Sequence, residues 1–341
     1  MITAEDVKKR ARALGADVVK IGNIERWDGA PPQMDPRQIM PEAKSIIGML
    51  FRINRGSLRG IEEGTFFSNY PAMGYGGLNY IYMPMVVINL TKDIEDAGYE
   101  AIPYGHQSSW RAIGSDGTVR SGFSRPVAPG RAYPDVMVHL RIAAFLCGLG
   151  EIGYSKVFLS PQFGPRNRIG IVITDAPLEP DPIYEGPQLC DRCMACVRDC
   201  PAQAIPPDRT VKVTAAGHDL EWADIDLNAC GPQFTGRVPT KEVLAEENQY
   251  IPPNGDTYYS RGFWTPFYHQ PPLLYKQGSA ICGGRGCIRA CMIQLEARGV
   301  LENKFHDKFR RRKPWTVDWT TEDELGPGAK GYKGPGKGDF I

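Results

Sequence analysis

The stretch that decides the fold is CDRCMACVRDCP (residues 190–201), in which four cysteines stand at the spacing C-x2-C-x2-C-x3-C and a proline follows. Three thiolates on one short loop can hold three corners of a four-iron cluster. The fourth, Cys200, lies on the following helical turn and points away, toward a second cluster. Zinc sites usually separate two cysteine pairs more widely, so the spacing favours iron–sulfur chemistry over zinc.

A second group of thiolates is therefore expected, and the chain supplies it at Cys230, Cys282, Cys287 and Cys291. Crossing ligands between the groups assigns one [4Fe-4S] cluster to Cys190, Cys193, Cys196 and Cys291. The other cluster then takes Cys200, Cys230, Cys282 and Cys287. One cluster with four structural cysteines is the alternative. The ninth cysteine, Cys147, ends an apolar stretch and is expected to be a buried, inert thiol.

The bulk composition is that of an ordinary soluble globular protein. The 341 residues are 42% apolar and 23% charged with a net charge of +1, so no overall field attracts nucleic acid or an anionic membrane. No apolar run approaches the length of a membrane helix, and the N-terminus lacks the apolar stretch of a signal peptide. An odd number of crowded cysteines fits metal ligation better than disulfides. We expect a cytoplasmic protein with no membrane span.

The residues before the cysteines alternate between expected helices and strands. Thr3, Asp6 and Gly15 are typical of the start and end of a first helix. Helices are also expected over 78–97 and 134–147, joined to a long glycine- and aromatic-rich loop at 55–77. Apolar and β-branched runs predict strands over 16–24, 45–53, 99–104 and 168–174.

These elements divide the chain into three parts. An α/β or α+β lobe is expected over 1–180. The cysteine lobe covers 181–300 and contains an aromatic insertion at 231–277. The last part, 301–341, ends in a mobile Gly/Pro/Lys-rich tail. The predicted fold class for the whole chain is α+β.

The glycines Gly148, Gly150 and Gly153 match the pattern G-x-G-x-x-G. A dinucleotide-binding fingerprint should follow a strand, whereas the segment before these glycines has helical spacing. Asp175 lies at about the distance expected for the ribose-binding acid, so that alternative stays open. We favour a helix-ending glycine turn that approaches a flat cofactor.

Four blocks of the sequence resemble the corrinoid-dependent reductive dehalogenases: GLGEIGYSKVFLSPQFGPRNR (148–168), TDAPLEPD (174–181), CPAQAI (200–205) and WADIDLNAC (222–230). The related epoxyqueuosine reductases share a weaker version of the same blocks. The resemblance implies a nitroreductase-like lobe of α/β type that binds a base-off corrinoid, cobalamin. Beside it would lie a ferredoxin-like lobe whose two [4Fe-4S] clusters pass electrons to cobalt.

The resemblance also implies a tyrosine proton donor beside a basic side chain. Arg166 best matches the basic residue, and Arg168, grouped with the glycines as a cofactor-binding residue, is its rival. Tyr104 is the preferred proton donor and Tyr154 the second choice. Asp135 lies near the position at which epoxyqueuosine reductases carry a carboxylate donor.

The function implied is an oxidoreductase that dehalogenates a small organohalide with electrons from an external ferredoxin or flavodoxin. The family leaves room for a homodimer. One alternative is reduction of a non-halogenated substrate, as in epoxyqueuosine reductases, although the weak basic balance argues against a tRNA-binding surface. The other alternative is a ferredoxin-like electron carrier without corrinoid.

Overall fold

The computed structural model of the chain describes residues 2–63, 65–66, 69–106, 114, 117–119, 125–235 and 280–309. Most of the predicted insertion at 231–277 and of the extension at 301–341 lies outside the described residues. Every helix in the described ranges is too short or too polar to cross a lipid bilayer.

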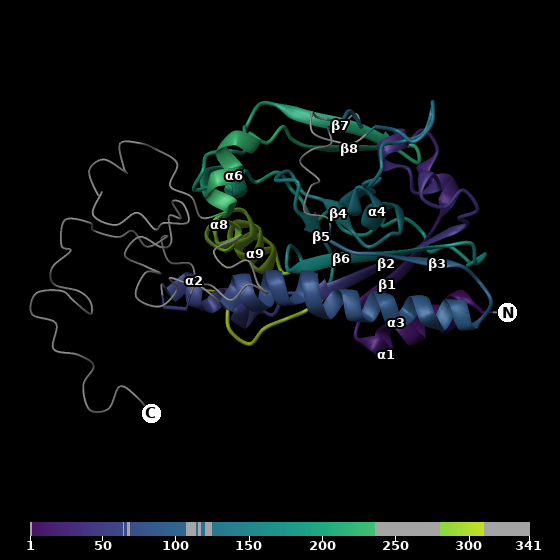
Figure 1. The fold of residues 1–341 in the computed structure, drawn as a ribbon. Helices are drawn as coiled ribbons and strands as arrows, with labels where there is room; N and C mark the ends of the chain where they lie inside the picture. Colours follow the sequence, from purple (N-terminus) through teal and green to yellow (C-terminus); the bar gives the residue numbers. More distant parts are fainter. Residues whose placement is uncertain are drawn as a thin grey trace, which may run out of the picture.

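A four-stranded sheet forms the centre of the fold (Figure 1). Its strands lie in the order β1 (Val18–Asn23), β2 (Ser45–Arg52), β6 (Asn167–Thr174) and β3 (Ala101–Tyr104). The four predicted strands are confirmed with small shifts at their ends. Every neighbouring pair is antiparallel. The α+β class is therefore confirmed for the described residues, whereas the α/β-type sheet expected for the first lobe is not found.

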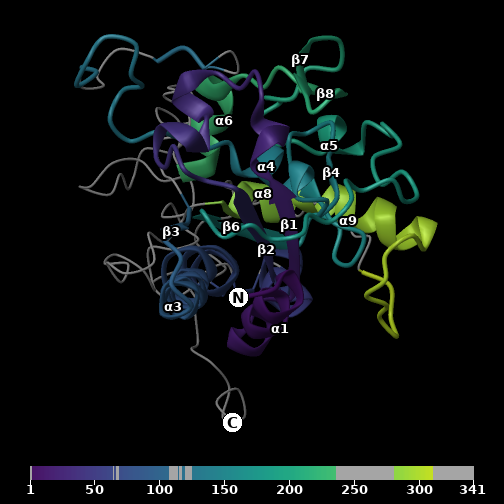
Figure 2. The same ribbon diagram turned by 90° about the vertical axis from the view of Figure 1, so that its right-hand side faces the viewer.

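Alternating side chains of β2 divide the core into two layers. Ile47, Met49 and Phe51 face a cluster that includes side chains of α1 (Ala4–Leu14) and α3 (Met83–Asp96). Ile46 and Leu50 face the opposite cluster, which includes α4 (Leu140–Leu146). Both ribbon views place α1 and α3 below the sheet and α4 above it (Figures 1 and 2).

The first helix begins and ends as predicted. The Thr3 side chain accepts from the Asp6 amide, and the Asp6 carboxylate accepts from the backbone and side chain of Thr3. Gly15 follows the helix with φ 120°. The capping box satisfies backbone groups that the first turn would otherwise leave without a partner.

The predicted loop at 55–77 is largely helical. Two short turns, η4 (Arg55–Leu58) and α2 (Arg59–Glu63), are followed by a π-helix, η5 (Tyr70–Tyr82), which continues directly into α3. A π-helix closes i to i+5 hydrogen bonds and therefore has wider turns than an α-helix. Tyr70, Tyr75 and Asn79, spaced by five and four residues, consequently lie along one side of it.

The predicted helix at 134–147 is also shorter than expected. Only Leu140–Leu146 is helical, and Asp135 has a left-handed φ of 64° that no right-handed helix accommodates. His139 caps α4 instead, because its Nδ1 accepts from the Ile142 amide. The residues before it bend at Asp135 and then run to His139 without regular secondary structure.

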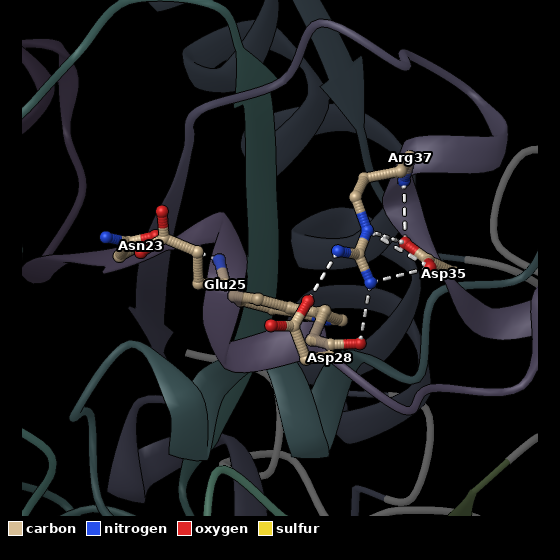
Figure 3. Close-up of polar contacts among 6 residues, drawn as sticks. Asn23, Glu25, Asp28, Asp35 and Arg37 are labelled. Atoms are coloured by element: carbon tan, nitrogen blue, oxygen red, sulfur yellow. Dashed lines mark hydrogen bonds and ion pairs between the residues drawn. The ribbon is translucent and has the colours of Figure 1, made fainter.

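A run of 3-10 turns after β1 is tied together by one guanidinium (Figure 3). Arg37 donates to Asp35 through three contacts, to Asp28 at 2.6 Å and to the Trp27 carbonyl at 3.0 Å. Asn23 caps the first turn by accepting from the Glu25 amide at 2.8 Å. These contacts fix the loop that carries Met34 to the cavity described below.

Five of the cysteines lie on short helices around this core: Cys196 on α5 (Ala195–Arg198), Cys230 on α6 (Leu227–Thr235), Cys282 on α8 (Ile281–Arg285), and Cys287 and Cys291 on α9 (Cys287–Arg298) (Figure 2). Cys190, Cys193 and Cys200 lie in the loop segments on either side of α5. A hairpin of β7 (Thr210–Ala215) and β8 (His218–Ala223) and the short pair β4 (Glu151–Ile152) and β5 (Phe158–Leu159) connect them to the sheet. Leu220 and Trp222 of the hairpin pack in the same cluster as Ile46 and Leu50.

One buried ion pair holds the cysteine helices against the N-terminal part of the chain. Arg289 lies on α9 between two cysteines and donates to both carboxylate oxygens of Glu62 on α2, at 2.8 Å for Nη2. Both side chains are nearly inaccessible, at 6% and 3% exposure. Such a pair stabilises little overall, but loss of one partner leaves the other buried and uncompensated.

We predict that Glu62→Gln lowers the free energy of unfolding by about 3–5 kcal/mol, because the Arg289 charge then stays buried without its counter-ion. Urea unfolding followed by circular dichroism measures the loss. The control is Asp93→Asn, which removes an exposed partner of Arg10 and should leave the midpoint nearly unchanged. Equal losses for the two variants would contradict this account.

Gly148→Ala should destabilise the fold more than Gly29→Ala. Both glycines have left-handed backbones, with φ of 84° and 80°. A Cβ at Gly148 would lie 2.1 Å from the Pro182 carbonyl oxygen, whereas Gly29 has nothing within 4 Å. Both variants pay about 1 kcal/mol for the backbone, and the clash adds about 1–3 kcal/mol at Gly148. Thermal unfolding of the pair tests this, and similar melting temperatures would refute it.

Candidate functional site

The loop that carries the first cysteines is wound tightly. Arg192 and Met194 both adopt left-handed backbone conformations, with φ of 54° and 57°. The loop is anchored by Glu151, whose carboxylate accepts from the amides of Leu189 and Cys190. Amide groups also approach two sulfurs: that of Tyr154 lies 3.3 Å from Cys190 Sγ, and that of Ala204 lies 3.4 Å from Cys200 Sγ. These contacts aim backbone N–H donors at the two sulfurs.

The first predicted set of thiols shares one electrostatic neighbourhood. Burial, followed by the neighbouring thiols of Cys190 and Cys193, raises the pKa of Cys196 to about 11. Burial also raises the pKa of Cys291 well above its usual range. The thiols that contribute to this second shift are those of Cys196, Cys287, Cys190 and Cys193.

The second predicted set is grouped in the same way. Burial raises the pKa of Cys287 to about 12, and the thiols that contribute are those of Cys200, Cys230 and Cys196. Burial likewise raises the pKa of Cys282, assisted by Cys287, Cys230 and Cys200. No group of three or more His, Cys, Asp or Glu residues in the described ranges is arranged for a single metal ion. A four-iron cube needs its thiolates farther apart than one ion does.

A cavity of about 280 Å³ opens between the π-helix, β6 and the second set of cysteines. Its walls include Tyr70, Tyr75, Asn79, His106 and Arg168, together with Cys200, Cys230, Cys282 and Cys287. None of the four cysteines of the first set lines this cavity. The charged side chains among the described lining residues are the cations Arg141, Lys156 and Arg168. A negatively charged ligand would therefore be favoured here.

Arg168 links two tyrosines in the cavity wall. Its Nη2 donates to the Tyr70 hydroxyl at 3.0 Å and its Nε donates to the Gly74 carbonyl at 3.1 Å. Its guanidinium carbon lies 4.8 Å from the centre of the Tyr75 ring, in a cation–π contact. Burial raises the pKa of both tyrosines, and Arg168 opposes that rise in each.

His106 adds a titratable group to the same wall. Its Nε2 lies 3.3 Å from the Tyr75 hydroxyl, and its ring contacts the edges of Tyr75 and Tyr80. The Tyr75 hydroxyl also bonds to Tyr80. The phenol of Tyr75 thus belongs to a network that Tyr70 does not share.

Among the described residues, three side chains of the cavity wall carry a buried polar atom that has no hydrogen-bond partner there: Asn79 Nδ2, Ser155 Oγ and His139 Nε2. Lys156 lies close to the last of these, because both it and His139 contact the Trp222 ring. A large ligand with amide and phosphate groups at its edge would supply partners for these atoms and for the cations. A corrinoid fits that description.

Of the two arginines predicted for the site, Arg168 lines the main cavity and Arg166 does not. Arg166 is 1% exposed and lies outside the cavity wall, where it donates to the Ile53 carbonyl and to Asn303. Burial lowers its pKa to about 10. Arg168, the second residue of β6, lines the cavity wall.

The predicted proton donors lie elsewhere. Tyr104 and Asp135 come together at a second hollow, where the Tyr104 hydroxyl donates to the Val136 carbonyl. Tyr154 packs beside the cysteines, and its hydroxyl donates to the Pro206 carbonyl at 2.8 Å. None of these three residues lines the main cavity.

The predicted cofactor glycines have a packing role in the structure. Gly148 lies against Pro182, and Gly150 and Gly153 lie against Leu159 and its neighbours. Their close approach closes the turn after α4 outside the cavity wall. Sequence reasoning missed Tyr70, Tyr75, Asn79 and His106. Tyr70 and Tyr75 stand in the segment assigned to a loop, Asn79 stands in the helix expected to follow it, and the five-and-four spacing of these three was the available signal. His106 carried no such signal.

Comparison with known proteins gives partial matches, and no protein-family model matches the chain. A tetrachloroethene reductive dehalogenase from Dehalobacter restrictus is 30% identical over 165 residues, which is 46% of this chain and 24% of that protein. An epoxyqueuosine reductase from Synechococcus sp. is 31% identical over 116 residues, or 32% of this chain and 36% of that one. The chain spans about a quarter of the length of the dehalogenase.

Among solved structures, the catabolic reductive dehalogenase NpRdhA superposes with a TM-score of 0.47 and 22% identity, covering 67% of this chain and 29% of that one. A score of this size carries no argument about function. The names of the matched relatives all denote oxidoreductases. By sequence, the chain is similar to the reductive dehalogenases and, over a shorter stretch, to the epoxyqueuosine reductases.

Proposed function

We propose that this chain is a corrinoid- and iron–sulfur-dependent reductase that removes halogen from a small organohalide. One observation carries the proposal: a single cavity brings together four cysteines of the second set and two tyrosines beside Arg168. The similarity to proteins named tetrachloroethene reductive dehalogenase supports it. Reduction of a carbon–halogen bond needs electrons, a proton and a site shielded from water. In this cavity the cysteines would hold the electron carrier, the tyrosines could donate the proton, and the apolar wall would exclude water.

The cysteines would hold two [4Fe-4S] clusters in the two sets assigned from the sequence. The second set faces the cavity and the first does not, so electrons from a ferredoxin or flavodoxin would enter through the first. When bound, the clusters and the corrinoid would carry the two electrons that are needed to replace the carbon–halogen bond with a carbon–hydrogen bond. The amides near Cys190 and Cys200 stabilise negative charge on the sulfurs.

The remaining work belongs to the chain's own side chains. The apolar wall excludes water, which strengthens electrostatic interactions inside the cavity. Buried tyrosines keep their protons at neutral pH, because burial raises their pKa. Arg168 stabilises the phenolate that forms when one of them protonates the substrate carbon. The balanced reaction consumes two electrons and one proton and releases the hydrocarbon and a halide ion.

Two other functions are tested by the same experiments. Reduction of a non-halogenated substrate is favoured by the match to an epoxyqueuosine reductase. An electron carrier without corrinoid would use the clusters alone. The first alternative predicts corrinoid binding without dehalogenation, and the second predicts neither.

Anaerobically reconstituted protein should contain about eight iron and eight sulfide ions per chain. Cys193→Ser should lose close to half of both, because it removes a ligand of the first cluster only. Cys147→Ser is the matched control, since this buried thiol lies in the sheet core and should leave the content unchanged. About four ions of each kind in the unaltered chain would contradict the two-cluster assignment.

Hydroxocobalamin should bind the reconstituted protein at close to one per chain, as measured by its absorbance after gel filtration. With reduced viologen as donor, the loaded protein should release halide from at least one member of a panel of halogenated aromatics and alkanes. Arg168→Gln should lower that rate by about 100-fold, since it removes the charge that supports the phenolate. Binding without halide release from any substrate would favour the non-halogenated alternative, and no binding would favour the carrier.

A further inference from the structure

The inference concerns how the cavity regains the proton that each turnover consumes, and it rests on the proposed function. Tyr70 is 0% exposed, and among the described residues its hydroxyl has Arg168 as its hydrogen-bond partner. A guanidinium does not release its proton in proteins. Tyr70 could therefore give up one proton, but this partner could not return it.

Tyr75 has the partner that Tyr70 lacks. Its hydroxyl lies 3.3 Å from His106 Nε2, within reach of a hydrogen bond. Histidine is the side chain that gains and loses a proton near neutral pH. His106 is only partly buried and follows the edge strand β3, whereas Tyr75 is 6% exposed inside the wall. The pair thus connects the interior of the cavity with a more accessible group.

The surroundings of Tyr75 keep its phenol protonated at rest and stabilise the phenolate once the proton has been transferred. Burial raises the pKa of its phenol, so the proton is present at neutral pH. Arg168 lies 4.8 Å from its ring centre and opposes this rise, so it stabilises the phenolate once formed. The bonds from Arg168 to Tyr70 and Gly74 hold the guanidinium in that position. Tyr70 is thereby a positioning residue.

We propose that Tyr75 is the catalytic acid of this cavity and that His106 returns the proton to it. In the forward step the Tyr75 O–H bond breaks, its proton goes to the substrate carbon, and the halide leaves with the electron pair of its former bond. The two electrons come from the external donor. In the second step the His106 Nε2–H bond breaks, the Tyr75 O–H bond reforms, and His106 takes a proton from solvent.

The test compares single-turnover with steady-state halide release in the loaded protein, using a substrate that the unaltered chain dehalogenates. Tyr75→Phe should lower both rates by about 100-fold or more, the range of general acid catalysis. His106→Gln should leave the first turnover nearly unchanged, lower the steady-state rate by at least 10-fold and regain it with added imidazole. Tyr70→Phe should lower both rates less than Tyr75→Phe does.

Two further measurements separate this role from a structural one. His306→Gln, at a fully exposed histidine, is the matched control and should match the unaltered chain in both rates. Tyrosine labelled at Cζ gives an NMR signal for Tyr75, assigned by its loss in Tyr75→Phe. That signal should shift as His106 titrates and stop shifting in His106→Gln.

The outcomes are distinct. Full steady-state activity in His106→Gln, or a larger loss in Tyr70→Phe than in Tyr75→Phe, overturns the relay while the proposed function stands. A Tyr75 signal that ignores the titration overturns it as well, without any assay of turnover. A chain that binds no corrinoid and reduces no substrate overturns the relay and the proposed function together.

Discussion

One helical turn separates Cys287 from Cys291 on α9, and the arrangement of the site depends on that turn. The two thiols belong to different neighbourhoods, one beside Cys200 and Cys230, the other beside Cys190 and Cys193. A single rigid element thus fixes the separation of the two sets. Between them, Arg289 is held by Glu62 in a nearly inaccessible ion pair. The position of the cysteines is therefore set from the N-terminal part of the chain as well as from their own loops.

The charged side chains of the cavity determine which ionised groups it can stabilise. Three cations and no described carboxylate line a space whose other walls are mostly apolar. In such surroundings the attraction between a guanidinium and a phenolate is stronger than in water. The same surroundings penalise a phenolate with no cation near it. Arg168 therefore lowers the cost of a phenolate at both tyrosines beside it, and its own position is fixed by the hydrogen bonds to Tyr70 and Gly74.

Much of the fold was predictable because its signals are local. The strands β1, β2, β3 and β6 follow from apolar runs, and α1 follows from Thr3, Asp6 and Gly15. The two cysteine sets remain a prediction from spacing, since covalent geometry limits what one loop can reach. The wall of the main cavity was not predictable in this way. A π-helix has a period that neither the 3.6 nor the 2.0 pattern detects, so Tyr70 and Tyr75 were assigned to a loop. The end of a strand favours Tyr104 as the proton donor, but the structure places it with Asp135 at a second hollow, outside the wall of the main cavity.

The wide turns of η5 have a consequence for how this segment can vary among related chains. Because a π-helix has more residues per turn than an α-helix, removing one residue between Tyr70 and Asn79 would rotate everything beyond it by roughly a quarter of a turn around the helix axis. Asn79 and the start of α3 would then leave the faces on which they now pack. Substitutions that keep the aromatic and small side chains leave the helix phase intact, whereas insertions and deletions do not. This segment should therefore tolerate substitutions better than insertions or deletions.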